Sequence, residues 1–263
     1  MAYKLVALDL DDTLLDSQKR VSGQNKDAIE RMKNAGIHVV LASGRIYHSI
    51  APYNKALGLH DYTIACAGAQ AVNADGEVVY SNYIPPTTSE QVMRWAERRG
   101  IYFQVYLDDG FYYLRRTGYS EDYERMGGFA GAEDPCLLSR NPLLAAKIIL
   151  IDENERLLEY QKELAATFAD VRILLSQSNY LEVLSMDASK GNSLAFIAGK
   201  LGIEREQVIA VGDSQIDASM IEYAGLGIAV ANACPECLKA ADYVTASNEE
   251  NGVAKAIDKH ILF

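Results

Sequence analysis

The sequence predicts an α/β protein: a doubly wound parallel-sheet core (Rossmann-like) that carries an inserted α+β domain. Apolar strand-like runs alternate with amphipathic helical segments near both ends of the chain, an order typical of parallel sheets. About a hundred residues in the middle have a different, hairpin-rich character. Acidic and small polar residues follow directly after several of the apolar runs, where open parallel sheets bind their ligands.

The first part of the chain reads as strand, helix, strand, helix, strand and hairpin. Ala28, Ile29 and Met32 recur at helical spacing, and Gly36 marks a helix end. The hairpin is expected to turn at Asp75–Gly76. The expected strands span 4–10, 37–43 and 62–68, the helices 25–36 and 46–58, and the hairpin 69–84.

Two prolines followed by Ser and Thr residues mark a boundary after this hairpin, and the α/β alternation resumes after residue 185. We therefore expect a core formed by residues 1–83 and 186–263, with an α+β domain inserted at 84–185. Within the insert the expected elements are helices 91–100 and 153–168, a hairpin 101–116 turning at Asp109–Gly110, and strands 145–152, 171–176 and 180–185. The closing segment predicts helices 189–202, 217–225, 236–241 and 250–261, and strands 207–213, 226–232 and 242–247.

Composition excludes several classes of protein. The 263 residues carry a formal net charge of −11, which argues against a nucleic-acid binder because such proteins need a basic surface. No apolar run is long enough for a membrane span, and no signal peptide is recognisable, so we expect a cytoplasmic protein with no membrane partner. Cys234 and Cys237 form a C-x-x-C pair without a second pair, which favours reduced thiols near a short helix over a zinc site.

The first expected strand ends in an acidic cluster. Asp9 and Asp11 are two residues apart, so both can face one site at the carboxyl end of the strand. Carboxylate oxygens in such a position suit Mg²⁺, which keeps several waters and accepts phosphate oxygens. Thr13 is expected to satisfy backbone donors at a turn.

Three further segments place chemical groups at other strand ends or helix starts. Ser43-Gly44-Arg45 offers a hydroxyl and free amides before a helix, an arrangement that binds anions. Lys190 lies in the first turn of a helix, and Asp213 ends a strand four residues before Asp217. Together these groups could supply a nucleophile, a metal site, an anion site and a fixed cation, which phosphoryl transfer through an aspartyl phosphate requires.

These four ordered motifs resemble the haloacid dehalogenase superfamily, and the chain is most similar to its Cof-type, class IIB phosphatases. The resemblance implies that Asp9 attacks phosphorus, that Asp11 is the acid and then the base, and that Lys190 stabilises charge. It implies Mg²⁺ bound through Asp9, the Asp11 backbone carbonyl and Asp213, supported by Asp217. It assigns phosphate or substrate binding to Ser43, Gly44, Arg45, Lys190 and Asn232. It also implies that the insert is a cap domain.

The chain departs from that pattern at three positions. Asp12 stands where the subfamily often has Gly, and this variant still fits a turn. Ala67 and Ile216 stand where the subfamily often has Asn, which removes two amides near the expected site. From the four motifs and the resemblance we expect a Mg²⁺-dependent phosphatase of small phosphorylated metabolites such as sugar phosphates, acting as a monomer or weak homo-oligomer. Two alternatives stay open: a phosphomannomutase-like phosphotransferase, and a catalytically weak binding protein with the same fold.

Overall fold

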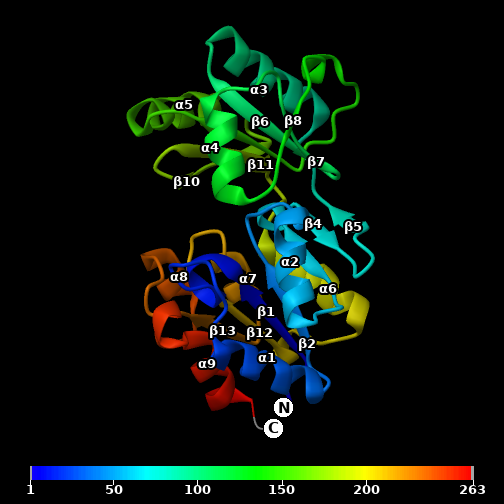
Figure 1. The fold of residues 1–263 in the computed structure, drawn as a ribbon, viewed down its shortest axis with the longest axis vertical. Helices are drawn as coiled ribbons and strands as arrows, with labels where there is room; N and C mark the ends of the chain where they lie inside the picture. Colours follow the sequence, from blue (N-terminus) through cyan, green and yellow to red (C-terminus); the bar gives the residue numbers. More distant parts are fainter. Residues whose placement is uncertain (1, 262–263) are drawn as a thin grey trace. The chain divides into compact units, whose positions relative to one another are not determined.

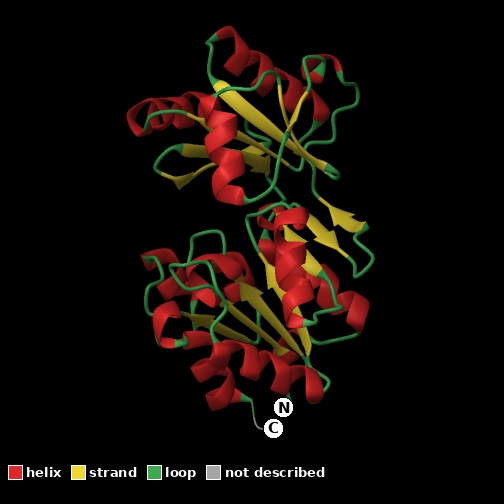
Figure 2. Ribbon diagram, in the orientation of Figure 1, coloured by secondary structure: helices red, strands yellow, loops and turns green. Residues whose placement is uncertain are grey.

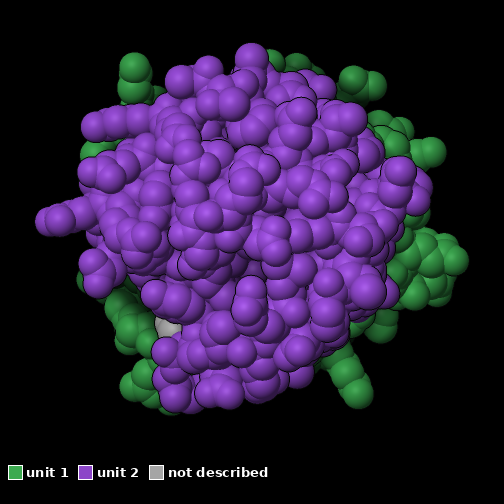
Figure 3. Space-filling view, turned by 90° about the horizontal axis from the view of Figure 1, so that it is seen from above, with its two compact units in different colours: residues 1–80, 189–263 green, residues 81–188 purple. Residues whose placement is uncertain are grey.

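The computed structural model describes residues 2–261, without the side chains of residues 126 and 127. The chain divides into two compact units, residues 1–80 with 189–263 and residues 81–188, which Figure 3 colours green and purple. None of the helices in the described part of the chain combines the length and apolar character that a membrane span requires.

The first unit is built on an eight-stranded sheet with the order β14-β13-β12-β1-β2-β3-β4-β5 (Figures 1 and 2). The pairs from β14 to β3 are parallel, and β4 runs antiparallel to β3. The strands are β1 (Leu5–Asp9), β2 (His38–Ala42), β3 (Thr63–Ala65), β4 (Gln70–Val72), β5 (Val78–Ser81), β12 (Val208–Gly212), β13 (Leu226–Ala229) and β14 (Tyr243–Val244).

Helices cover both faces of this sheet, because alternate residues of each buried strand point to opposite sides. Val6 and Leu8 of β1 pack with α1, α2 and α9, whereas Leu5 and Ala7 pack with α6 and α7. The doubly wound parallel core expected from the sequence is confirmed. Its helices are α1 (Gly23–Asn34), α2 (Tyr47–Leu57), α6 (Lys190–Leu201), α7 (Ala218–Tyr223), α8 (Pro235–Ala240) and α9 (Gly252–His260).

The second unit is a six-stranded sheet with the order β10-β11-β9-β6-β7-β8. An apolar core joins one face of this sheet to α3 and α5. Its strands are β6 (Tyr102–Leu107), β7 (Gly110–Tyr113), β8 (Ala132–Glu133), β9 (Lys147–Ile151), β10 (Val171–Gln177) and β11 (Tyr180–Ser185), and its helices are α3 (Pro86–Arg98), α4 (Gly118–Gly127) and α5 (Asn154–Thr167).

Two details of this unit differ from the sequence-based expectation. Leu107 pairs with Gly110, so the β6–β7 turn consists of Asp108 and Asp109, and Gly110 already belongs to β7. The predicted turn at Asp109–Gly110 is therefore wrong by one residue, because Asp-Gly is a frequent turn pair but strand register decides its position. Helix α4 and strand β8 were not expected from the sequence.

Candidate active site

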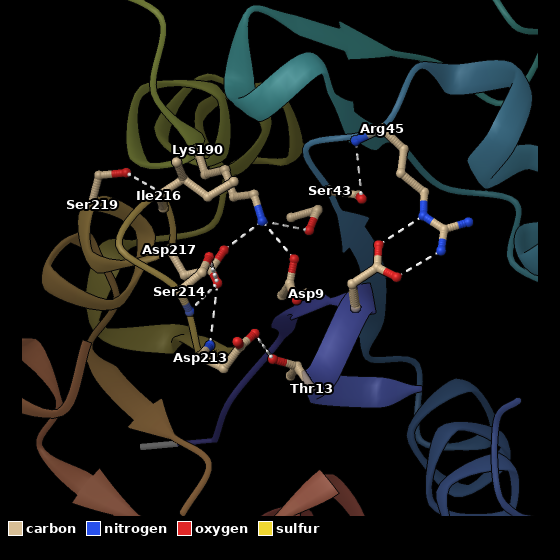
Figure 4. Close-up of polar contacts among 12 residues, drawn as sticks. Asp9, Thr13, Ser43, Arg45, Lys190, Asp213, Ser214, Ile216, Asp217 and Ser219 are labelled. Atoms are coloured by element: carbon tan, nitrogen blue, oxygen red, sulfur yellow. Dashed lines mark hydrogen bonds and ion pairs between the residues drawn. The ribbon is translucent and has the colours of Figure 1, made fainter. Parts of the chain in front are cut away.

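The candidate site lies at the carboxyl ends of β1, β2 and β12, which are neighbours in the first sheet. Asp9 ends β1, Ser43 follows β2, and Asp213 follows β12. The amino end of α6 brings Lys190 to the same edge, as Figure 4 shows. Parallel strands thus collect residues that are far apart in the sequence.

Lys190 is the centre of the cluster. Its side chain is fully buried, although lysines in the first turn of a helix are usually solvated. The Nζ atom lies 2.6 Å from Asp9 Oδ1 and 2.9 Å from the carbonyl oxygen of Ala42, and it also pairs with Asp217 Oδ1. Burial alone would lower the pKa of Lys190, but Asp217 and Asp9 raise it above the ordinary lysine value. The ammonium is therefore a fixed positive charge.

Local packing makes this position possible. Gly68 has φ +89°, and a Cβ atom there would lie 2.1 Å from the carbonyl carbon of Ser189. The Ser193 hydroxyl donates a 2.8 Å hydrogen bond to the Gly68 carbonyl oxygen, which ties the loop after β3 to α6. The Ser189 hydroxyl caps α6 by accepting from the backbone N–H of Asn192. A side chain at position 68 would push away the turn that carries Lys190.

Three carboxylates surround this ammonium. One ligand atom from each of Asp9, Asp213 and Asp217 lies within 4.8 Å of the others. Burial and the charge of Asp217 raise the pKa of Asp9 well above its usual value despite Lys190. Burial and Asp217 likewise raise the pKa of Asp213 to about 6. Three negative charges against one positive charge leave a formal charge of −2.

Asp217 has a different position from the other two acids. Its side chain is fully buried, and Oδ1 pairs with Lys190. Oδ2 accepts hydrogen bonds from the backbone N–H groups of Asp213 and Ser214 and from the Ser214 hydroxyl. Asp217 therefore holds the loop after β12 and orients Lys190.

The carboxylate of Asp11 points to another set of partners. Arg45 Nε lies 2.7 Å from Asp11 Oδ2 and Arg45 Nη2 lies 2.6 Å from Oδ1, and Lys19 Nζ is 3.0 Å from Oδ1. Burial would raise the pKa of Asp11, but Arg45 and Lys19 together lower it. The resting form of Asp11 is thus the carboxylate, whereas the sequence argument expects an acid that can hold a proton.

The family of haloacid dehalogenase-like hydrolases matches residues 6–257 of this chain. The chain belongs to this family. Phosphatase YwpJ of Bacillus subtilis (strain 168) is 29% identical over 286 residues, covering 98% of this chain and 100% of that protein. The 5-amino-6-(5-phospho-D-ribitylamino)uracil phosphatase YcsE of the same organism is 29% identical over 262 residues, covering 98% and 96%. The crystal structure of a haloacid dehalogenase-like hydrolase from Bacteroides thetaiotaomicron superposes with a TM-score of 0.88 at 30% identity, covering 98% and 99%.

The donor set of this hydrolase fits a hard divalent cation. Asp9 and Asp213 offer carboxylate oxygens, the ligands that Mg²⁺ prefers. Burial raises the pKa of these two groups most, and the negative charge of Asp217 raises it further. A bound cation of charge +2 would balance the formal charge of the cluster.

Several residues predicted to bind phosphate or substrate have contacts with other parts of the core. Ser43 is buried, and its hydroxyl accepts a hydrogen bond from the Arg45 N–H. Gly44 approaches Ile216, whose Cδ1 atom would be 3.5 Å from a Cβ there. Arg45, expected to bind substrate, is paired with Asp11. The Asn232 amide donates to the Asp12 carbonyl oxygen and accepts from the Asn248 N–H, so it braces two loops.

Two contacts of the site were not expected from the sequence. The Thr13 hydroxyl, expected to satisfy backbone donors at a turn, donates a 2.7 Å hydrogen bond to Asp213 Oδ1 across 200 residues of sequence. Lys19 was not considered, although it pairs with Asp11. Nothing in the local sequence distinguishes Lys19, but Thr13 could have been found from its place in the acidic loop itself.

Proposed function

We propose that this hydrolase is a Mg²⁺-dependent phosphatase that cleaves small phosphomonoesters, such as sugar phosphates, through an aspartyl phosphate on Asp9. The observation that carries the proposal is the buried Lys190 held between Asp9 and Asp217, with Asp213 beside them. The names of YwpJ and YcsE as phosphatases support the same reaction class. We also assign the inserted unit the role of a cap domain that selects among substrates.

In the first half-reaction an Asp9 carboxylate oxygen bonds to phosphorus, and the bond from phosphorus to the leaving oxygen breaks. Lys190 favours the ionised form of Asp9 against the effects of burial and Asp217, and it opposes the charge that builds up on the phosphoryl oxygens. Asp9 and Asp213 would hold Mg²⁺, which supplies further charge neutralisation when bound. The backbone amides after β2 suit the phosphoryl oxygens.

Asp11 handles the proton in both halves. A protonated Asp11 gives its proton to the leaving oxygen, and the resulting carboxylate then takes a proton from the water that attacks phosphorus. That second attack breaks the bond between phosphorus and Asp9 and releases inorganic phosphate. The contacts of Asp11 with Arg45 and Lys19 favour the carboxylate, which the second half needs. The first half requires these contacts to weaken when substrate binds.

A phosphate-release screen over small phosphomonoesters tests the proposal. The wild-type protein is expected to release phosphate with Mg²⁺ and to lose activity reversibly with EDTA. Asp9→Asn is expected to abolish turnover because an amide cannot form the phosphoenzyme. Hydrolysis that persists in Asp9→Asn would reject Asp9 as the nucleophile. Transfer of the phosphoryl group from Asp9 to a sugar, and not to water, would identify the phosphotransferase alternative.

A further inference from the structure

The face of the inserted unit's sheet opposite its apolar core carries polar side chains beside buried apolar ones such as Ile149 and Leu184. Alternate residues of strands β6, β9, β10 and β11 belong to the apolar core under α3 and α5, among them Val105, Ile148, Ile173 and Val183. The residues between them point to the opposite face. That face carries four polar or charged side chains, Gln104, Lys147, Arg172 and Glu182.

Three of these four side chains have a partner on the same face. Lys147 Nζ lies 3.2 Å from Glu182 Oε2, and both side chains are largely buried. Gln104 Nε2 donates a 2.8 Å hydrogen bond to the hydroxyl of Tyr106. These contacts follow the usual rule that buried polar groups are paired.

Arg172, on the edge strand β10 (Figure 1), is the exception. Its side chain is half-buried, and its Nη2 donates to the carbonyl oxygen of Ala188. Its Nε atom is buried and has no hydrogen-bond partner in the described part of the chain. Burial lowers the pKa of Arg172, and no carboxylate of the described residues offsets this effect. Glu182, the acid on the neighbouring strand, is engaged by Lys147.

A half-buried cation without a counter-ion is unfavourable unless something else compensates it. The planar guanidinium fork matches carboxylate and phosphate groups better than any other side chain. We propose that Arg172 is an anion-binding residue of the inserted unit, which takes a carboxylate or phosphate group. The ligand is a small carboxylate or phosphate ion from solution, so the proposal does not rest on the proposed phosphatase function.

Urea unfolding distinguishes an anion-binding role of Arg172 from a purely structural one. Arg172→Gln removes an uncompensated charge, so its urea midpoint is expected to equal or exceed that of the wild type. Arg99→Gln is the matched control in the same unit, because Arg99 pairs with Glu163 at 2.6 Å and lies 4.4 Å from the Trp95 ring centroid. The control is expected to lower the midpoint. An equal loss in Arg172→Gln would make Arg172 a structural cation and overturn the proposal.

Anion binding can be observed at the residue itself. In ¹⁵N-labelled full-length protein the Nε–H signal of Arg172 is identified by its absence in Arg172→Gln. Titration with sodium sulfate against sodium chloride at constant ionic strength is expected to shift this signal saturably. The Nε–H signal of Arg99 is expected to stay in place. This measurement needs no turnover, so it tests the proposal even if the phosphatase assignment fails.

The two signals together decide the proposal. A saturable sulfate shift of the Arg172 Nε–H signal, without a shift of the Arg99 signal, assigns a small-anion site to Arg172. If the Arg172 signal does not shift saturably, or if the Arg99 signal shifts equally, the proposal is overturned.

Discussion

Replacing Lys190 by methionine tests whether the acidic cluster depends on its ammonium. Lys190 is fully buried against Asp9 and Asp217, and methionine is similar in length but uncharged. Removing one partner of a buried ion pair typically lowers the free energy of unfolding by roughly 3–5 kcal/mol. We expect a loss of this size in metal-free protein near neutral pH. The pKa of Lys190 is raised, so its contribution is fully present below the ordinary lysine pKa and disappears only as pH rises through the raised value.

The loss of unfolding free energy in Lys190→Met has an upper limit that depends on pH, because a carboxyl group left without its ammonium can be protonated. A stranded carboxylate can take up a proton, which costs about 1.4 kcal/mol for each pH unit above its ordinary pKa of about 3.9. Neutralising one carboxyl group therefore costs roughly 4 kcal/mol near pH 7 and about 1.5 kcal/mol near pH 5. The destabilisation of Lys190→Met is accordingly expected to shrink as the pH falls. Magnesium is expected to recover part of it, about 2.7 kcal/mol at a concentration of 100 Kd.

Urea unfolding followed by far-UV circular dichroism measures the loss. The single tryptophan, Trp95, lies in the inserted unit, so its fluorescence does not report directly on the site. Lys200→Met on the same helix is the control, because Lys200 is exposed and its Nζ lies 5.4 Å from the Phe196 ring centroid. The control is expected to lose less than about 1 kcal/mol. Wild-type stability in metal-free Lys190→Met at neutral pH would refute the reasoning.

Three other outcomes are expected. In the folded protein Asp213 has a pKa of about 6, above its unfolded value, so its contribution to stability falls as the pH rises from about 4 to about 6. Urea titrations of metal-free wild type and Asp213→Asn at several pH values measure this, and parallel dependences of stability on pH would contradict it. Ala67 has φ +56°, so Ala67→Gly is expected to raise the urea midpoint by relieving about 0.5–1 kcal/mol of left-handed strain, and a lowered midpoint would count against strain there. Iodoacetamide followed by peptide mass spectrometry is expected to label exposed Cys136 before buried Cys66 and Cys237, and the reverse order would be inconsistent with the structure.

Much of the fold was predictable because strand and helix periodicities are local. The core strands start and end within a few residues of the expected ranges, with Leu5–Asp9 for 4–10 and His38–Ala42 for 37–43. The region 117–144 was not predictable in this way. It holds the capped helix Gly118–Gly127 and the two-residue strand Ala132–Glu133, and neither has a long apolar repeat.

By itself the sequence determined which groups end the strands of the core. Asp9, Ser43 and Asp213 follow apolar runs, and parallel strands bring their carboxyl ends to one edge of a sheet. Only the tertiary structure decided how those groups pair. It buries Lys190 between two carboxylates, and it turns Asp11 toward Arg45 and away from that cluster. The physical reason is that burial and the distance between charges depend on packing between segments far apart in the chain, which local patterns do not contain.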